Sequence, residues 1–357
     1  MQSIDYRKLI EAAVLAPTPD NNQPWRFAVR DERLSLYLDP TRTLPSDVNS
    51  MFDLVGLGAA IENACIAARQ GGYEPKVEFA DCPAELLKDP LRPVASITFL
   101  PGGRPDPLYP CLATRFTCRR LYSTKPVPMQ SLDQMAETAQ QSGPVRVDWV
   151  TDRSQITEMA SLLAASDLIR FQYEPFHNEL FRQLRFTVQE AEQTRDGLDV
   201  RTLDLPPGVA WLLRKLQPWK RMHKVHQLGL GRLLTMPSAL AVRRSGALGL
   251  LSVDQPKTES FLCGGMAFER LWLTATALKL ALQPLGSMPI FLAHWQQLGG
   301  SRLPAKHIAR VEYLYDRLRS LLPQLSGGVL QIMFRVGQSA PSKFRSLRRR
   351  AEDVYAT

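Results

Sequence analysis

A weak internal repeat constrains the fold of this chain more than any other sequence feature. Gly58-Ala-Ala-Ile-Glu62 aligns with Gly265-Met-Ala-Phe-Glu269, at an offset of 207 residues from position 58 to position 265. The apolar pattern of residues 6–13 recurs at residues 132–139, at an offset of 126 residues. Two unequal offsets indicate a duplication with a long insertion in the second copy. The alternative is that any two buried helices share small and apolar positions.

Apolar periodicity predicts helices and strands in both parts of the chain. The first part is expected to hold helices at 3–16 and 56–71, and strands at 26–30, 34–38, 76–79 and 94–100. The second part is expected to hold helices at 131–140, 261–282 and 308–322, and strands at 145–150 and 330–336. Pro101-Gly-Gly-Arg-Pro-Asp-Pro107 is the best linker. We therefore expect halves at 1–103 and 104–357, with a mostly helical insertion at about 155–250.

The chain is basic, with 44 Lys and Arg against 35 Asp and Glu and a formal net charge of +9. This favours an anionic partner such as a nucleic acid, a membrane surface or a phosphorylated cofactor. The charge is densest at 214–224 and 343–350. The 5 cysteines are widely spaced without a Cys-x-x-Cys pair, which indicates a reducing cytoplasm rather than a disulfide framework. We expect no signal peptide, and no membrane span because charged residues interrupt the apolar stretch 261–282.

Several motifs for other functions are incomplete. Gly56-Leu-Gly-Ala-Ala-Ile61 and Gly229-Leu-Gly-Arg-Leu-Leu234 begin like a dinucleotide fingerprint but lack its third small residue. No Walker loop is present. His223 and His226 stand in a basic cluster that would repel a metal cation. We therefore expect no Rossmann site and no metal site.

Arg115-Phe-Thr-Cys-Arg-Arg-Leu-Tyr122 is the first segment that points to chemistry. In an extended chain, Arg115, Thr117 and Arg119 would point to one side. Two guanidinium groups and a hydroxyl suit a phosphate and the edge of a planar heterocycle. The alternative is a solvated basic strand.

The second such segment is Pro17-Thr-Pro-Asp-Asn-Asn-Gln-Pro-Trp25. Its prolines stiffen a loop that can lay backbone groups and side-chain amides along a flat ligand. The alternative is an ordinary turn with Trp25 packed in the core.

These segments resemble motifs of the FMN-dependent nitroreductase family. Ala16-Pro-Thr-Pro-Asp-Asn-Asn-Gln-Pro-Trp-Arg-Phe27 resembles its "APS..N.QPW.F" signature, and Arg115-x-Thr-x-Arg119 with Pro126-Val-Pro128 resembles its opening "R.S.R.F…PV". Residues 265–286 resemble its long central helix and the "P.G" turn, and 334–354 its closing arginine segment. The resemblance touches most of the chain except about 155–250.

The order of the motifs points to a particular branch of that family. The family usually forms homodimers with two FMN sites across the interface, whereas here each signature occurs once and in reversed order. The chain therefore resembles the tandem, single-chain branch, which includes mycobacterial Acg-type proteins and the nitroreductase portion of some ThiF-type fusions. The resemblance implies an α+β fold in which two fused halves form an intramolecular pseudo-dimer, with a helical insertion in the second half.

The resemblance also implies the site residues. Arg115, Thr117 and Arg119 would hold the phosphate, ribityl chain and pyrimidine edge of FMN, and Arg348 or Arg349 would add a guanidinium to the phosphate. The flavin ring would lie against Pro17, Thr18, Pro19 and Asn21. Leu285 and Gly286 would place a backbone N–H near the flavin N5, although Leu285 stands where many relatives have an acidic or small residue.

The resemblance implies an FMN-dependent oxidoreductase whose flavin carries the chemistry, so no catalytic side chain is expected. Hydride would pass through flavin N5 to a nitroaromatic, a quinone or another small oxidant, with NAD(P)H as a candidate donor. The alternative is a flavin-sequestering protein whose closed site has little NAD(P)H turnover. We expect a monomer or weak homo-oligomer that binds no nucleic acid. For the insertion, helical padding is favoured over a lid, and a membrane-surface helix is the least favoured reading.

Overall fold

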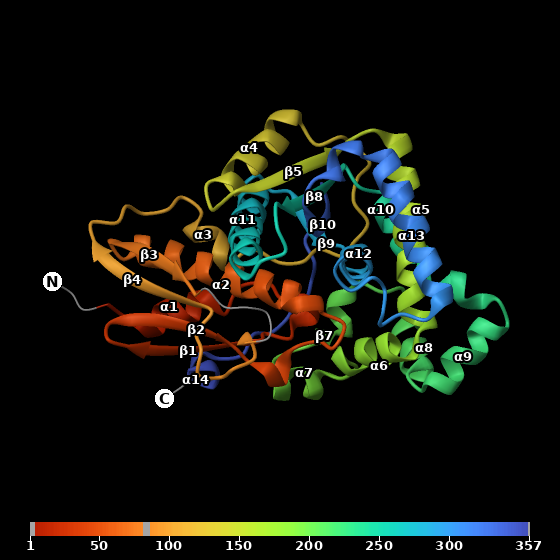
Figure 1. The fold of residues 1–357 in the computed structure, drawn as a ribbon, viewed down its shortest axis with the longest axis horizontal. Coiled ribbons are helices and arrows are strands. Elements are labelled where there is room, and N and C mark those ends of the chain that lie inside the picture. The colour runs from red at the N-terminus through yellow and green to blue at the C-terminus, as the bar shows by residue number, and fades with distance from the viewer. Residues whose placement is uncertain (1–3, 81–85, 356–357) are drawn as a thin grey trace.

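The computed structural model describes residues 4–80 and 86–355 and contains two four-stranded antiparallel sheets with a pair of long helices between them (Figure 1). The first half has strand order β1-β2-β4-β3. Its elements are α1 (Tyr6–Ala13), β1 (Trp25–Arg30), β2 (Arg33–Leu38), α2 (Met51–Gln70), β3 (Tyr73–Phe79) and β4 (Ala95–Pro101), with short 3-10 turns η1 (Pro19–Asn21), η2 (Pro40–Arg42) and η3 (Val48–Ser50).

The second half repeats this plan. Its strand order is β5-β8-β10-β9, which matches the first sheet strand for strand. The repeated elements are α4 (Met129–Gln140), β5 (Val145–Val150), β8 (Ala247–Val253), α11 (Thr258–Ala277), β9 (Ala281–Pro284) and β10 (Val329–Gly337). The protein is therefore an α+β fold of two fused halves, as predicted. The predicted boundary at 103/104 falls between β4 and α3 (Tyr109–Leu112), and it stays a prediction.

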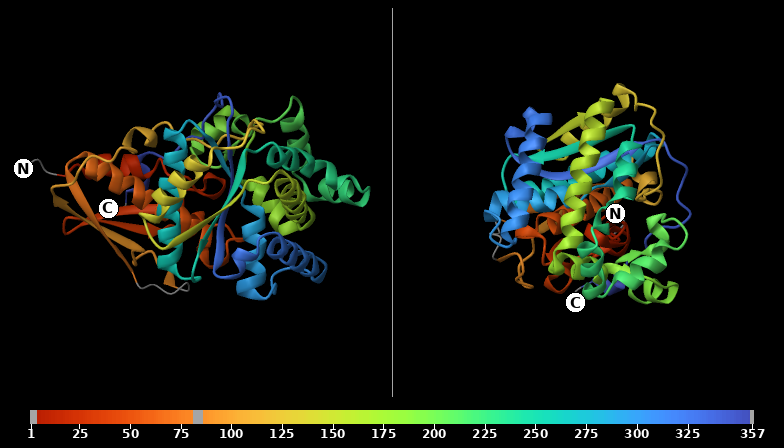
Figure 2. Two further views of the ribbon diagram at one scale, coloured as in Figure 1. Left: turned by 90° about the horizontal axis from the view of Figure 1, so that it is seen from above. Right: turned by 90° about the vertical axis from the view of Figure 1, so that its right-hand side faces the viewer.

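Helical insertions distinguish the second half from the first. The segment between β5 and β8 holds α5 (Arg153–Gln172), α6 (Glu174–Gln183), α7 (Val188–Thr194), α8 (Val209–Leu216), α9 (Trp219–Gln227) and α10 (Met236–Arg243). It also holds the short parallel pair β6 (Leu184–Arg185) and β7 (Leu198–Asp199) and the turns η5 (Val200–Leu203) and η6 (Leu230–Thr235). A second insertion between β9 and β10 holds α12 (Ser287–Leu298), α13 (Ala305–Leu321) and η7 (Pro323–Ser326). The helices α5, α8, α9, α10 and α13 form the end of the molecule away from the first sheet, whereas α7 lies near the first half (Figure 1, Figure 2).

Three predictions were wrong, each for a physical reason. The strand β8 was not predicted, and it begins within the end of the segment predicted as mostly helical at about 155–250; all seven of its residues are buried, and a fully buried strand has no alternation to reveal it. The helix predicted at 261–282 ends at Ala277, and Lys279 adopts a left-handed φ of 58° before β9. Residues 115–122 lie in an irregular segment rather than a strand.

The two long helices cross at the glycines of the internal repeat. A Cβ atom on Gly58 of α2 would lie 2.1 Å from the carbonyl oxygen of Leu262, and one on Gly265 of α11 would lie 2.3 Å from that of Val55. The helices therefore touch backbone to backbone. Equivalent positions meet in both directions, as at a twofold interface.

The residues that follow these glycines also contact one another reciprocally. Glu62 pairs with Arg270 (2.6 Å), and Glu269 accepts a hydrogen bond from Asn63 (3.1 Å) when the amide is turned with its nitrogen toward the carboxylate. Positions 62 and 269 are partners in the repeat, as are 63 and 270. This reciprocity supports the duplication.

The end of the chain returns to the first half. After β10 it runs to α14 (Ala351–Val354), and Tyr355 forms a bridge with Phe27 of β1. Trp25 and Trp272 lie in one hydrophobic core that spans both halves. Among the described helices, one segment, Val48–Gln70, is long and apolar enough to cross a membrane, and 89% of it is buried inside the protein. Cys82 lies outside the described residues, and the cysteines within them are free thiols.

Replacing Gly58 with Ala should destabilise the protein, because the new methyl group would overlap the Leu262 carbonyl. We expect a loss of about 2 kcal/mol or more in the free energy of unfolding, measured by urea denaturation. Gly327→Ala is the matched control, since a Cβ there would meet no atom within 4 Å among the parts of the chain that the structure describes. Equal stability of the two variants would contradict a backbone contact at the crossing.

Candidate functional site

A cavity of about 270 Å³ lies between the two halves. The first half contributes Pro17, Thr18 and Pro19, and the second half contributes Thr117 and Arg119, about a hundred positions later. The apolar wall comes from both long helices and the second sheet, through Phe52, Val55, Phe268, Trp272, Ile332 and Met333. Two segments that the sequence singled out separately therefore line one cavity.

The loop at 17–23 has a backbone that few residue types adopt easily. Asp20, Asn21 and Gln23 have positive φ values of 46°, 57° and 52°. The Gln23 N–H donates to the Thr18 hydroxyl (3.1 Å) and closes the loop. Gly56 of α2 lets the loop approach, because a Cβ there would lie 2.7 Å from Thr18 Cγ2. The folded loop thus presents Pro17 to Pro19 to the cavity, while Trp25 is fully buried in the core.

Leu285 and Gly286, which lie between β9 and α12 in the second half, also line the cavity. The Leu285 N–H donates to the Met333 carbonyl (2.7 Å), so it is already used within the fold. The Gly286 N–H has no such partner among the described residues, and it precedes the first residue of α12. Of the two predicted N–H donors, Gly286 is the one available to a ligand.

A smaller cavity of about 100 Å³ shares Thr117 and Arg119 with the larger one. Its polar lining includes three hydroxyl residues, Thr117, Thr202 and Ser346, and four arginines, Arg115, Arg119, Arg345 and Arg348. No Asp or Glu of the described residues lines it. We call it the basic chamber.

The basic chamber concentrates positive charge in a buried place. Burial, together with repulsion from Arg115 and Arg119, lowers the pKa of Arg348 to about 9. Burial also lowers the pKa of Arg119. Buried cations are costly unless an anion compensates them. The chamber is therefore built for an anionic group such as a phosphate, which guanidinium forks bind well.

Arg115 has a second role besides lining the chamber. It pairs with Glu269 (3.0 Å) and stacks on the Trp272 ring (4.7 Å to the centroid). It also donates to the carbonyl of Leu15. Because Glu269 neutralises much of its charge, Arg115 contributes less free positive charge than its neighbours, and it ties the second half to the first.

Two predicted residues do not line either cavity. Asn21 donates to the carbonyls of Gly197 and Leu347 (3.0 Å each), so it holds the loop in place instead of facing the cavity. Arg349 donates to the Asp353 carbonyl. The sequence left Arg348 and Arg349 as alternatives, and the structure places Arg348 in the basic chamber.

Sequence analysis missed a pair of carboxylic acids at the cavity. Asp47 lines it and accepts the N–H groups of Phe52 (3.0 Å) and Asp53 (2.8 Å). Burial raises the pKa of Asp47 to about 7, and burial with repulsion from Asp47 raises the pKa of Asp53. The two carboxyls therefore hold a proton near neutral pH. The start of α2 at Met51, earlier than predicted, hid this capping position.

The insertion covers the cavity. Its residues 195–202, here called the covering loop, contribute Leu198 to the cavity wall. The Gln23 amide donates to the Arg195 carbonyl (2.8 Å), and Asp196 pairs with Arg42 and with Arg185. On α5, Arg170 pairs with Asp20 (2.7 Å). The insertion is thus tied to the loop at 17–23, which agrees with a lid better than with padding.

The two buried carboxyls predict how stability depends on pH. Because the folded pKa of Asp47 is about 7 and its ordinary value is 3.8, the folded state binds more protons between these pH values. This contribution to stability is complete below about pH 4 and is lost as the pH rises through 7. We expect the urea midpoint of the wild type to fall between about pH 4 and pH 7.

The double variant Asp47→Asn, Asp53→Asn should lose most of that fall. Urea denaturation of both proteins across the pH range measures the difference. A wild-type midpoint that rises with pH, or an equal slope in the variant, would show that these carboxyls are ionised in the folded protein.

The protein resembles known families in sequence. The model of the nitroreductase family matches residues 112–307. An uncharacterized protein of Mycobacterium tuberculosis is 28% identical over 341 residues, which are 95% of this chain and 46% of that protein. A second M. tuberculosis protein, provisionally named as the NAD(P)H nitroreductase acg, is 27% identical over 179 residues, 49% of this chain and 52% of that protein. The chain spans about half the length of the curated relatives it matches.

Solved structures are similar at a lower level. The FMN-dependent nitroreductase NfnB of Mycobacterium smegmatis, solved with NADPH, is 15% identical with a TM-score of 0.39, covering 69% of this chain and 96% of that one. Iodotyrosine deiodinase, solved with FMN and 3-iodo-L-tyrosine, is 13% identical with a TM-score of 0.38, covering 68% and 95%. A likeness at this level does not bear on the reaction of this chain.

Proposed function

Because the chain belongs to the nitroreductase family, we propose that its two joined cavities hold FMN and that it is an FMN-dependent oxidoreductase acting on a small molecule. The observation that supports this proposal is the junction, at Thr117 and Arg119, of an apolar cavity with a chamber that four arginines line and no described Asp or Glu lines. Such a site suits a ligand with a flat apolar body at one end and an anionic group at the other. FMN has this form.

The chain's residues fit FMN as follows. Arg345, Arg348 and Arg115 would bind the phosphate, helped by the hydroxyl residues Thr202 and Ser346. Pro17 to Pro19 and the aromatic wall would enclose the ring, and the Gly286 N–H would be its hydrogen-bond donor.

When bound, FMN would supply the hydride chemistry, taking electrons from NAD(P)H and passing them to a nitroaromatic, a quinone or another small oxidant. The protein would bind the cofactor and exclude water with the covering loop. Arg119, at the junction of the cavities, places positive charge beside the ring site, where it would stabilise developing negative charge. Asp47 would hold a proton on its carboxyl at the cavity wall. Otherwise the reaction needs no catalytic side chain.

Arg348→Gln should purify with little flavin, whereas Arg349→Gln should keep it. The two residues are adjacent and lose the same charge, but only Arg348 lines the basic chamber. Losing one charged hydrogen-bonding group costs about 1.5–3 kcal/mol, or at least tenfold in affinity. The flavin-to-protein ratio from absorbance gives the result, and thermal melts check that both variants fold. Equal flavin content in both would count against the assigned phosphate site.

A second candidate function is storage of flavin in a closed site. The contacts of the covering loop to Gln23 and Arg42 favour it, because they seal the cavity against a large donor such as NADPH. Adding NADPH under argon separates the two functions. Bleaching of the flavin band supports the oxidoreductase, and persistent colour supports storage.

Loosening the covering loop should speed that reduction. Asp196→Asn removes the partner of Arg42 and Arg185, so we expect faster bleaching by NADPH than in the wild type. Glu192→Gln, an exposed change on the neighbouring helix α7, is the control and should leave the rate unchanged. If Asp196→Asn reduces no faster than this control, the loop does not limit access.

A further inference from the structure

A cationic segment without acidic residues forms the outer part of the insertion. Residues 205–246 contain eight Lys and Arg and no Asp or Glu. All eight are exposed, and none pairs with a carboxylate among the residues that the structure describes; they are Arg214, Lys215, Lys220, Arg221, Lys224, Arg232, Arg243 and Arg244. The predicted cofactor site uses none of this charge.

The same segment exposes large apolar side chains. Trp211 is 64% exposed and Leu228 73%. Leu230, Leu233, Met236 and Leu240 recur every three or four residues along η6 and α10, and each is 46% exposed or more. An apolar stripe at helical spacing normally faces a core. Here the apolar stripe faces solvent, which indicates that a binding partner covers this surface when the protein functions.

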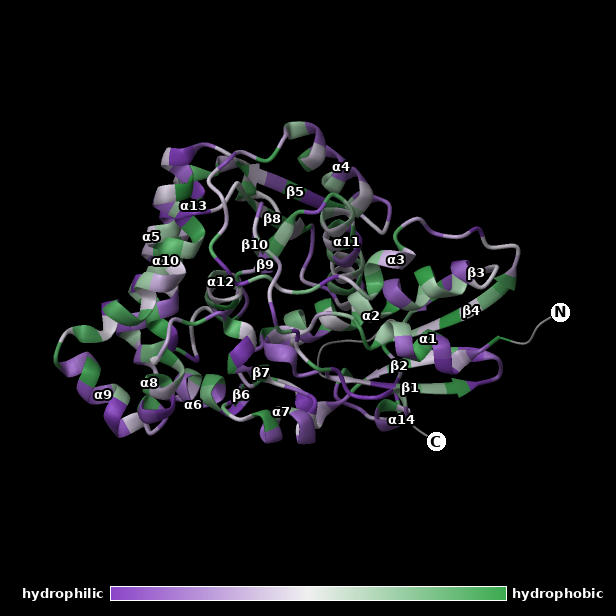
Figure 3. Cartoon of the chain, turned by 180° about the vertical axis from the view of Figure 1, so that it is seen from behind, coloured by the Kyte–Doolittle hydropathy of each residue, from purple (hydrophilic) through white to green (hydrophobic). Residues whose placement is uncertain are grey.

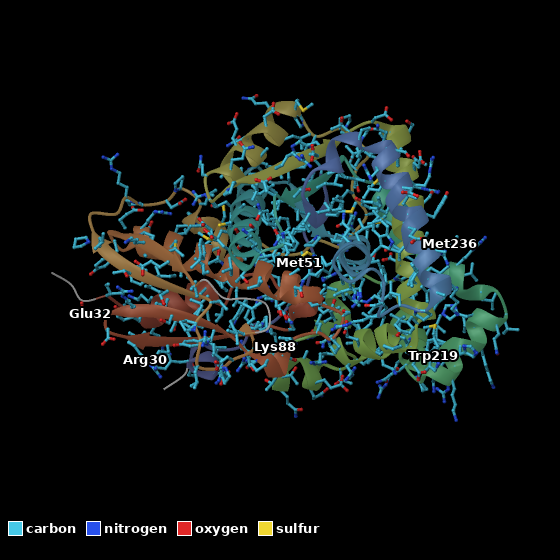
Figure 4. The ribbon with its side chains drawn as sticks, viewed as in Figure 1. Arg30, Glu32, Met51, Lys88, Trp219 and Met236 are labelled. Atoms are coloured by element: carbon cyan, nitrogen blue, oxygen red, sulfur yellow. The ribbon has the colours of Figure 1, made fainter. Side chains whose placement is uncertain are left out.

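This surface is held in place and lies far from the first half. α8 and α9 stand at the outer edge of the molecule, where Trp219 and Met236 are labelled (Figure 1, Figure 4). Both helices carry polar as well as apolar residues (Figure 3). Leu216 and Met222 bury their side chains with Phe181 of α6 in a small separate core. The exposed residues therefore project from anchored helices.

The combination of charge and apolar groups selects among partners. A nucleic acid would neutralise the cations but leave the leucines and Met236 in water. A second copy placed symmetrically would bring eight cations against eight others. An anionic bilayer satisfies both, because its headgroups attract Lys and Arg while its acyl boundary accepts Trp, Leu and Met.

We propose that α8, α9, η6 and α10 form a docking surface for an anionic lipid bilayer. The protein would lie on the membrane through this surface, with the leucines of η6 inserted at the acyl boundary. This reading, the least favoured one for the insertion from the sequence, gains its support from the exposure of residues whose direction the sequence did not show.

The test is co-sedimentation of the full chain with lipid vesicles. We expect binding to vesicles of phosphatidylcholine with phosphatidylglycerol, weakening as salt is added, and little binding to phosphatidylcholine alone. Lys220→Gln, Arg221→Gln, Lys224→Gln should weaken the apparent affinity about tenfold or more. Leu233→Gln, Met236→Gln should also weaken it, by removing apolar anchors.

The matched control removes three exposed cations from the opposite end, as Arg7→Gln, Lys8→Gln, Lys76→Gln, and should leave binding unchanged. Equal losses in both triple variants would mean a response to net charge alone and would overturn the proposal. Absence of vesicle binding would also overturn the proposal. This holds even if the chain is found to bind RNA or to self-associate through Leu233. Flavin content is measured in each variant, so failure here is distinct from failure of the FMN proposal.

Discussion

The crossing of α2 and α11 at Gly58 and Gly265 is the contact on which the rest of the structure depends. Because each helix lies against the backbone of the other, neither glycine tolerates a side chain. The crossing fixes how the two halves face each other. It also places Val55 of α2 and Phe268 and Trp272 of α11 on the cavity wall. The position of the candidate site therefore follows from the same close approach that joins the halves.

The two halves share a strand order but not a set of site residues. The first half supplies the proline loop, and the second supplies Thr117, Arg119 and the Gly286 N–H. The insertion in the second half then covers the cavity that they form together. Positive charge gathers in two places that differ in burial, the largely buried basic chamber and the exposed surface of α8 to α10. Their different burial leads to different proposed partners, a phosphate and a bilayer.

Predictions from the sequence succeeded where a single helix, strand or turn is determined by residues close together in the chain. The hairpin of β1 and β2 is an example, since Asp31 and Glu32 take the left-handed φ that a two-residue turn needs. Predictions failed for β8, because a strand buried on both faces shows no alternation of polar and apolar residues. They also failed for Asp47, because its chemical character depends on contacts with residues far away in the sequence. Asp47 is ordinary in sequence. The pKa of Asp47 is raised by its burial and by repulsion from Glu179 of α6, which belongs to the insertion.

The sequence by itself determined that a proline loop and an arginine segment occur once each, and it indicated a duplication with a long insertion in the second copy. These features are local, because glycine, proline and apolar spacing act on a few neighbouring residues. Only the tertiary structure decided that Arg348 enters the basic chamber while Arg349 does not, and that Glu269 takes up much of the charge of Arg115. Those outcomes depend on pairings between residues more than a hundred positions apart. A local sequence pattern does not show which charged residue will pair with a given buried residue.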